Sequence, residues 1–71
     1  MGFEMLSEME IWRSAAAMIK RYGKDAGSES ARHAHELLVT GDTNGAATWR
    51  RIVAAVEKIQ AMTPGEEEKQ H

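Results

Sequence analysis

Apolar side chains recur at helical spacing in three stretches of this chain, and no stretch alternates with the period of two that a strand requires. The clearest stretch covers residues 43–62, where Trp49, Ile52, Val53, Val56 and Ile59 fall at positions i, i+3, i+4, i+7 and i+10. This spacing puts all five on one face of a helix that packs against a core. Residues 8–22 and 25–40 have apolar faces of their own. The sequence therefore predicts an all-α fold.

The first predicted helix has clear start and stop signals. Ser7 and Glu10 match a capping box, in which the serine hydroxyl accepts from the backbone N–H of residue 10 and the glutamate reaches back. Lys20 and Arg21 complement the C-terminal end of the helix dipole, and Gly23 can take the left-handed conformation just past the end. These signals predict a helix over residues 8–22.

The second helix starts less clearly, because Asp25 and Ser28 are both candidate N-caps; we place its start at Asp25. Gly41 ends this helix and Asp42 caps the next one, so the two predicted helices cover residues 25–40 and 43–62. The second helix has a narrow, mostly small apolar face, made of Ala31, Ala34, Leu37 and Leu38.

Short connections between the helices predict a small three-helix bundle with up, down, up topology. In this arrangement Trp12, Leu38 and Trp49 share one layer of the core. Pro64 stops the third helix, and the residues after it contain three consecutive glutamates and no large apolar side chain. We therefore predict one domain over residues 1–63 and a disordered, flexible acidic tail over residues 64–71.

Composition limits the stability and the setting of this domain. The chain has 71 residues and no cysteine, so it has a thin core, no disulfides and no thiolate metal site. Eleven of its hydrophobic residues are alanine, which buries little area. No apolar run approaches the roughly 20 residues that span a bilayer, and no signal-peptide pattern opens the sequence. We therefore expect a cytoplasmic protein that does not insert into membranes.

The histidines and serines do not form a pattern typical of a metal site or an active site. His33 and His35 are two residues apart, which on a helix points them in nearly opposite directions. None of the four serines has a base placed beside it by a motif. The sequence predicts no metal, no cofactor and no enzymatic activity.

Basic residues suggest an alternative function, in which the last helix contacts nucleic acid. Arg50, Arg51 and Lys58 lie on that helix, and four further basic residues lie on or just after the first: Arg13, Lys20, Arg21 and Lys24. The net charge of −2 and the sequence pI of about 5.9 argue against this reading, because nucleic-acid-binding domains are usually basic.

Several motifs resemble those of a family of short bacterial helical proteins of unknown function. They are Tyr22-Gly23-x-Asp25-Ala26, Ala31-Arg32-x-Ala34, Glu36-Leu37-Leu38, Gly41-Asp42 and Gly45-Ala46-x-x-Trp49-Arg50-x-Ile52. The resemblance covers roughly residues 9–60 and concerns helix ends and core positions, so it implies a fold and no activity.

The function we predict from the sequence is that of a small non-enzymatic interaction or dimerisation module, which binds a protein partner or a second copy of itself. A thin core and five methionines motivate this prediction, because methionine suits adaptable apolar surfaces. The alternative is a small nucleic-acid-binding regulator that uses Arg50, Arg51 and Lys58.

Overall fold

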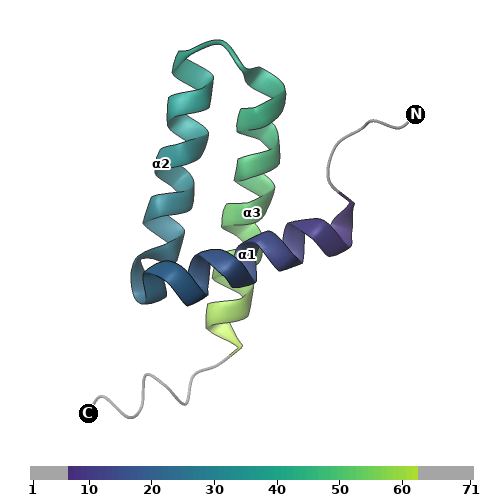
Figure 1. The fold of residues 1–71 in the computed structure, drawn as a ribbon, viewed down its shortest axis with the longest axis vertical. Coiled ribbons are helices and arrows are strands. Elements are labelled where there is room, and N and C mark those ends of the chain that lie inside the picture. The colour runs from purple at the N-terminus through teal and green to yellow at the C-terminus, as the bar shows by residue number, and fades with distance from the viewer. Residues whose placement is uncertain (1–6, 63–71) are drawn as a thin grey trace.

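The structure is a computed structural model that describes residues 7–62 (Figure 1). Its regular elements are α1 (Glu8–Tyr22), the 3-10 turn η1 (Gly23–Asp25), α2 (Ala26–Val39) and α3 (Thr43–Ala61). Every regular element in this range is helical, which confirms the all-α class. The predicted tail over residues 64–71 lies outside the described residues.

Local capping explains why α1 has the predicted bounds. The Ser7 Oγ accepts a hydrogen bond from the backbone N–H of Glu10 at 3.2 Å. At the other end, Gly23 has φ +60°, and its N–H donates to the carbonyl of Ile19. Only glycine takes this conformation without strain, so the helix stops where the sequence places Gly23.

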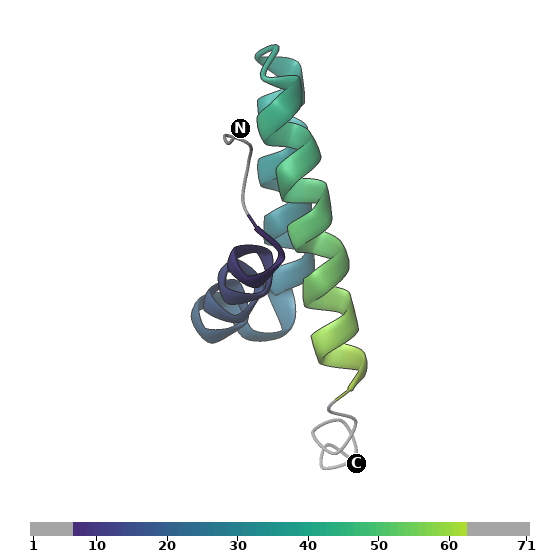
Figure 2. The ribbon, with the colours of Figure 1, turned by 90° about the vertical axis from the view of Figure 1, so that its right-hand side faces the viewer.

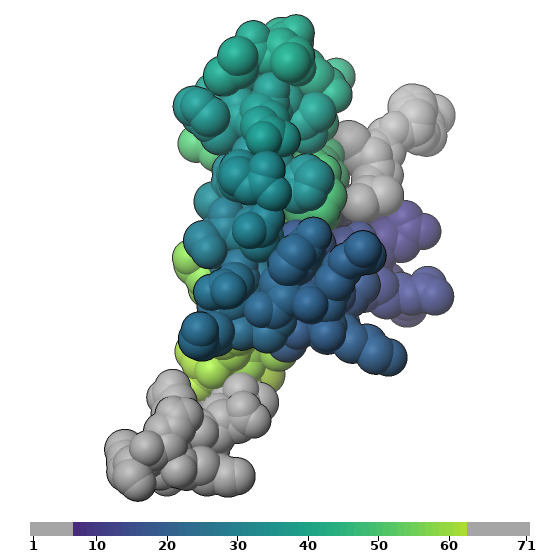
Figure 3. Space-filling model, turned by 60° about the vertical axis from the view of Figure 1, so that its left-hand side comes forward, coloured from purple at the N-terminus to yellow at the C-terminus, as the bar shows by residue number. Residues whose placement is uncertain are grey.

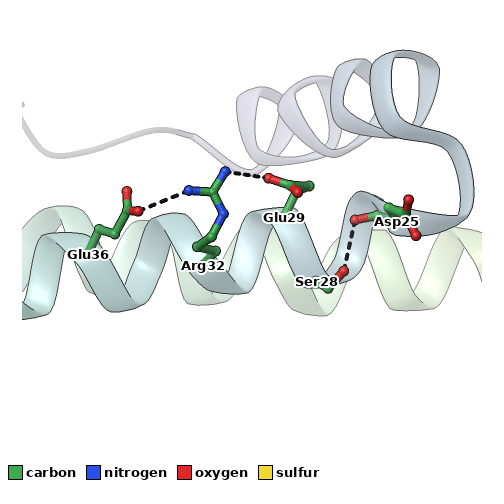
Figure 4. Close-up of polar contacts among 5 residues, drawn as sticks. All are labelled: Asp25, Ser28, Glu29, Arg32 and Glu36. Atoms are coloured by element: carbon green, nitrogen blue, oxygen red, sulfur yellow. Dashed lines mark hydrogen bonds and ion pairs between the residues drawn. The ribbon is translucent and has the colours of Figure 1, made fainter.

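The corner between α1 and α2 differs from the prediction, because α2 begins at Ala26 and not at Asp25. Residues 23–25 continue from α1 as a 3-10 turn, which leaves Asp25 with φ −91° and ψ 5° and no side-chain capping bond. A capping residue normally has extended backbone, which aims its side chain at the first N–H groups of the helix. Instead, the Ser28 hydroxyl donates to the Asp25 carbonyl at 3.2 Å (Figure 4).

A three-residue connection joins α2 and α3 into an antiparallel hairpin (Figure 1). Gly41 has φ +94°, and the Asp42 Oδ1 accepts from the backbone N–H of Gly45 at 2.9 Å. The glycine stop and the aspartate cap are therefore used as predicted. The helices end at Val39 and Ala61, each one residue earlier than predicted.

Helix α1 lies across one face of this hairpin and does not run alongside α2 and α3 (Figures 1 and 2). The up, down, up bundle is therefore not confirmed. Two features account for the crossing: Gly23 and the short η1 turn redirect the chain, and the Gln60 side chain donates to the Gly23 carbonyl at 3.1 Å. This bond ties the corner to the end of α3.

The crossing changes the layers of the core. Trp12 and Trp49 both pack against the central cluster, but Leu38, near the α2–α3 connection, is 51% exposed. The predicted layer of Trp12, Leu38 and Trp49 is wrong because α1 covers only the part of the hairpin away from that connection (Figure 3). The central cluster consists of Ile11, Ala15, Met18, Ala26, Ile52, Ala55 and Val56.

The buried face of α2 also differs from the prediction. Ala26, Ser30 and Ala34 are buried at intervals of four residues, whereas Ala31 and Leu38 are exposed. Small side chains along this stripe let α2 and α3 approach closely. The Ser30 hydroxyl oxygen is fully buried and has no hydrogen-bond partner within residues 7–62. From the sequence, Ser30 was considered only as a catalytic candidate and was not placed in the core.

Candidate protein-interaction surface

A shallow groove of about 520 Å³ runs between α2 and α3, and we call it the α2–α3 groove. It is lined mainly by small and aliphatic side chains, with three titratable residues among them. From α2 the lining residues are Ala31, Ala34, His35 and Leu38; from α3 they are Ala46, Arg50, Val53, Ala54 and Glu57.

Helical spacing puts this groove on the side of the hairpin opposite α1. Arg50, Val53 and Glu57 follow i, i+3 and i+7 and so form one stripe of α3. Ile52 and Ala55 form a different stripe, which packs with α1 in the central cluster. Figure 2 shows α1 on only one side of the hairpin. The other side of the hairpin is thus left without a packing element from the described part of the chain.

Leu38 extends the apolar character of the groove toward the α2–α3 connection. Leu38 lines the groove and is 51% exposed, and its neighbour Val39 is 71% exposed. Single exposed aliphatic residues are common on protein surfaces. A groove lined by several alanines and one exposed leucine is typical of a binding surface.

The charged side chains of the groove have no partner in residues 7–62. Arg50 and Glu57 both line it, and neither makes a hydrogen bond or an ion pair within this range. They lie seven residues apart on one helix, about 10 Å along its axis, which is too far for a mutual ion pair. Each therefore keeps its charge available to a molecule that enters the groove.

Arg32 shows the contrasting case of a charge already satisfied within one helix. Its guanidinium binds Glu29 and, at 2.9 Å, Glu36 (Figure 4). A hydrogen bond and the charge of Glu29, followed by the charge of Glu36, raise the pKa of Arg32 above its usual value. These partners lie three and four residues from Arg32, which is the spacing that brings side chains together on one face of a helix.

The two histidines of α2 lie in different environments. The His33 ring stacks on Trp49, with ring centroids 4.6 Å apart and an interplanar angle of 18°. His35 lines the α2–α3 groove. Spacing predicted that they point apart, but it gave no sign of the stacking partner. In the described part of the chain, no three His, Cys, Asp or Glu side chains are placed to hold a metal ion together.

The basic residues predicted to bind nucleic acid are divided between two surfaces. Arg51 and Lys58 line a second hollow of about 300 Å³ beside α1, together with Glu8 and Trp12. Arg50 lies in the α2–α3 groove. Arg50, Arg51 and Lys58 therefore do not line one common hollow. The hollow lined by Arg51 and Lys58 also contains the carboxylate of Glu8.

Sequence reasoning missed Glu57 and the groove itself. The available signal was the pattern of Arg50, Val53, Ala54 and Glu57, in which small residues lie between opposite charges on one helical face.

No family model, curated protein or solved structure matches this chain. Among the described helices, none is both long enough and apolar enough to cross a membrane.

Proposed function

We propose that this protein is a non-enzymatic interaction module that binds a protein surface through the α2–α3 groove. The observation that carries the proposal is the composition of the groove, which combines several alanines and exposed Leu38 with Arg50 and Glu57, two charged residues that have no partner in residues 7–62. On the resemblance given above and the absence of cysteine, we further propose a bacterial, cytoplasmic protein.

The physical argument concerns what such a groove accepts. A helix with a narrow apolar face fits between two helices when the floor side chains are small, because small side chains permit an interaxial distance near 8 Å. Apolar contacts then supply affinity, and charges at the edge fix orientation and exclude wrong partners. Ala31, Ala34 and Ala54 provide the small side chains, and Arg50 and Glu57 provide the charges.

The serines support a non-enzymatic role. The Ser7 hydroxyl caps α1, and the Ser28 hydroxyl binds the Asp25 carbonyl. Ser30 is fully buried, so no substrate could reach it. Within residues 7–62 no hydrogen bond joins a serine hydroxyl to a histidine. Within residues 7–62 the serines thus lack the hydrogen-bonded histidine that commonly acts as base in nucleophilic catalysis by serine.

Site-specific photo-crosslinking in cells tests the proposal. A photoreactive amino acid replaces Leu38 in the groove, and a matched variant carries it at Lys20, which is exposed on α1. We expect protein adducts from position 38 and only background from position 20. Equal yields from both positions, or no adducts from position 38, would contradict the proposal. Circular dichroism of both variants verifies that they are folded.

Nucleic-acid binding remains the alternative, and one measurement separates it from protein binding. A regulator of that kind would retard duplex DNA in a manner that weakens steeply with salt. Arg51→Ala together with Lys58→Ala would remove the effect, because these two side chains share the hollow beside α1. We expect no retardation at physiological salt.

A further inference from the structure

We infer that the partner in the α2–α3 groove is a second copy of this chain, with the two α3 helices packed antiparallel about a two-fold axis near Val53 and Ala54. This inference rests on the proposed function, since it names the occupant of the same groove. It is carried by the order of charges along α3.

The groove-lining stripe of α3 is symmetric in position and opposite in charge about its midpoint. Arg50 lies as far before the midpoint between Val53 and Ala54 as Glu57 lies after it. When two identical helices pack antiparallel, each residue before the midpoint faces the residue equally far after it on the other copy. Arg50 then faces Glu57 of the second copy, and the two-fold axis repeats this pair.

The alternative parallel arrangement places like charges together. With two parallel copies in register, Arg50 faces Arg50 and Glu57 faces Glu57, which costs free energy at both positions. The antiparallel register is therefore selected by charge as well as permitted by shape. It also supplies partners for the two groove charges that have none in residues 7–62.

The middle of the stripe suits the close approach that this register requires. Val53 faces Ala54 of the second copy, so the residues nearest the axis are a valine and an exposed alanine. Two helices with small side chains at the crossing pack about 8–10 Å apart, at the short end when alanine is present. Leu38 and Ala31 on α2 border the same groove and gain cover from the second copy.

Charge reversal on the full chain tests the register. In a dimer of Arg50→Glu, positions 50 and 57 of both copies are acidic and repel one another. In a dimer of Glu57→Arg, the same positions are all basic and also repel one another. We expect sedimentation equilibrium to show a dimer for the unaltered chain and a dissociation constant raised about tenfold or more for each variant. Mixing the two variants in equal amounts creates two attractive pairs and should restore a dimer of one copy of each.

The double variant Arg50→Glu/Glu57→Arg should also dimerise, because it exchanges the two charges. Lys20→Glu is the control, since it reverses a charge that is exposed on α1 and does not line the groove. It should leave the dissociation constant within about twofold, because charges outside the contact contribute little.

A crosslink gives a second measurement that does not depend on charge. The chain has no cysteine, so Ala54→Cys introduces a single thiol beside the proposed axis. Cysteines whose Cα atoms lie within about 7 Å can form a disulfide. We expect mild oxidation to give covalent dimers from Ala54→Cys much faster than from Ala17→Cys, whose side chain is exposed on α1.

Three results would overturn the inference: a chain that stays monomeric at all concentrations, charge variants that associate like the unaltered chain, or a mixture that fails to restore association. These results are distinguishable from failure of the proposed function. If the Leu38 photo-crosslinks reach other proteins while the chain stays monomeric, the groove binds a different partner. If position 38 yields no adducts, both proposals fail.

Discussion

Two valines on α3, three residues apart, allow the same chemical change to be made inside and outside the core. Val56 is fully buried in the central cluster, where its Cγ1 also lies 4.0 Å from the position a Cβ would take on Gly27. Val53 is half-buried and lines the α2–α3 groove. Val56→Ala and Val53→Ala each remove two methyl groups from one helix, so they differ only in environment.

The expected magnitudes follow from this difference. Removing two buried methyl groups costs about 1.6 kcal/mol in transfer free energy, and the cavity left behind raises the loss to about 2–3 kcal/mol. Val53→Ala exposes little new cavity and gains helix propensity, so its cost in the monomer is below about 0.5 kcal/mol. The whole chain is expected to have about 4–11 kcal/mol of stability, so the first loss is a large fraction of it.

Thermal unfolding followed by circular dichroism at low protein concentration measures both values. Each kcal/mol corresponds to about 4–8 °C in a domain of this size, so Val56→Ala should lower the Tm by roughly 8–24 °C and Val53→Ala by only a few degrees. Equal shifts for the two variants would refute the assignment of the Val56 face to the core and of the Val53 face to the surface. A larger loss for Val53→Ala would refute it as well.

Three further substitutions test other parts of the fold. Ser30→Ala removes a buried hydroxyl that has no partner in residues 7–62 and should raise the free energy of unfolding by about 1 kcal/mol; a lower Tm would show that the hydroxyl is satisfied in solution. Gly27→Ala adds a methyl group that meets Val56 at ordinary contact distance. It should raise the free energy of unfolding, measured by urea titration, by about 0.4–1 kcal/mol. Trp49→Ala removes a core-packed ring stacked on His33 and should cost about 3 kcal/mol, so a variant as stable as the unaltered chain would contradict its core role.

The helix bounds could be predicted from the sequence because they are set by interactions within a few residues. The Ser7 hydroxyl reaches the Glu10 N–H, and Asp42 reaches the N–H of Gly45. Gly41 needs no tertiary contact to stop a helix. The exception is Asp25, whose capping role was lost to the 3-10 turn, and two competing caps in the sequence had already made that start ambiguous.

The arrangement of the helices and the candidate surface could not be predicted in the same way. Periodicity says which face of a helix is buried, but it does not say against which helix or at what crossing angle. The crossing of α1 depends on the backbone of Gly23 and on a bond from Gln60, 37 residues further along. Ser30 was missed because serine is polar, and polar residues are not expected in a core. Its side chain is small, however, and a small side chain is what a position beside a closely packed helix requires. Glu57 was missed because its role depends on a surface that exists only once α2 and α3 have paired.

The short connection between α2 and α3 has a consequence for the route by which the chain folds. Thr40, Gly41 and Asp42 are the only residues between these two helices, so their pairing closes a very small loop and costs little entropy. The contact of Gly23 with Gln60 closes a far longer one. We therefore expect the α2–α3 hairpin to form first and α1 to dock on it afterwards. During unfolding, α1 can detach before the hairpin opens.

Such detachment would bare the Ile11 and Met18 side of α1 together with Ile52 and Ala55. Amide hydrogens of α1 should then exchange faster than those in the middle of α3. The lifetime of the protein in the presence of proteases would follow the docking equilibrium of one helix and not the stability of the whole domain.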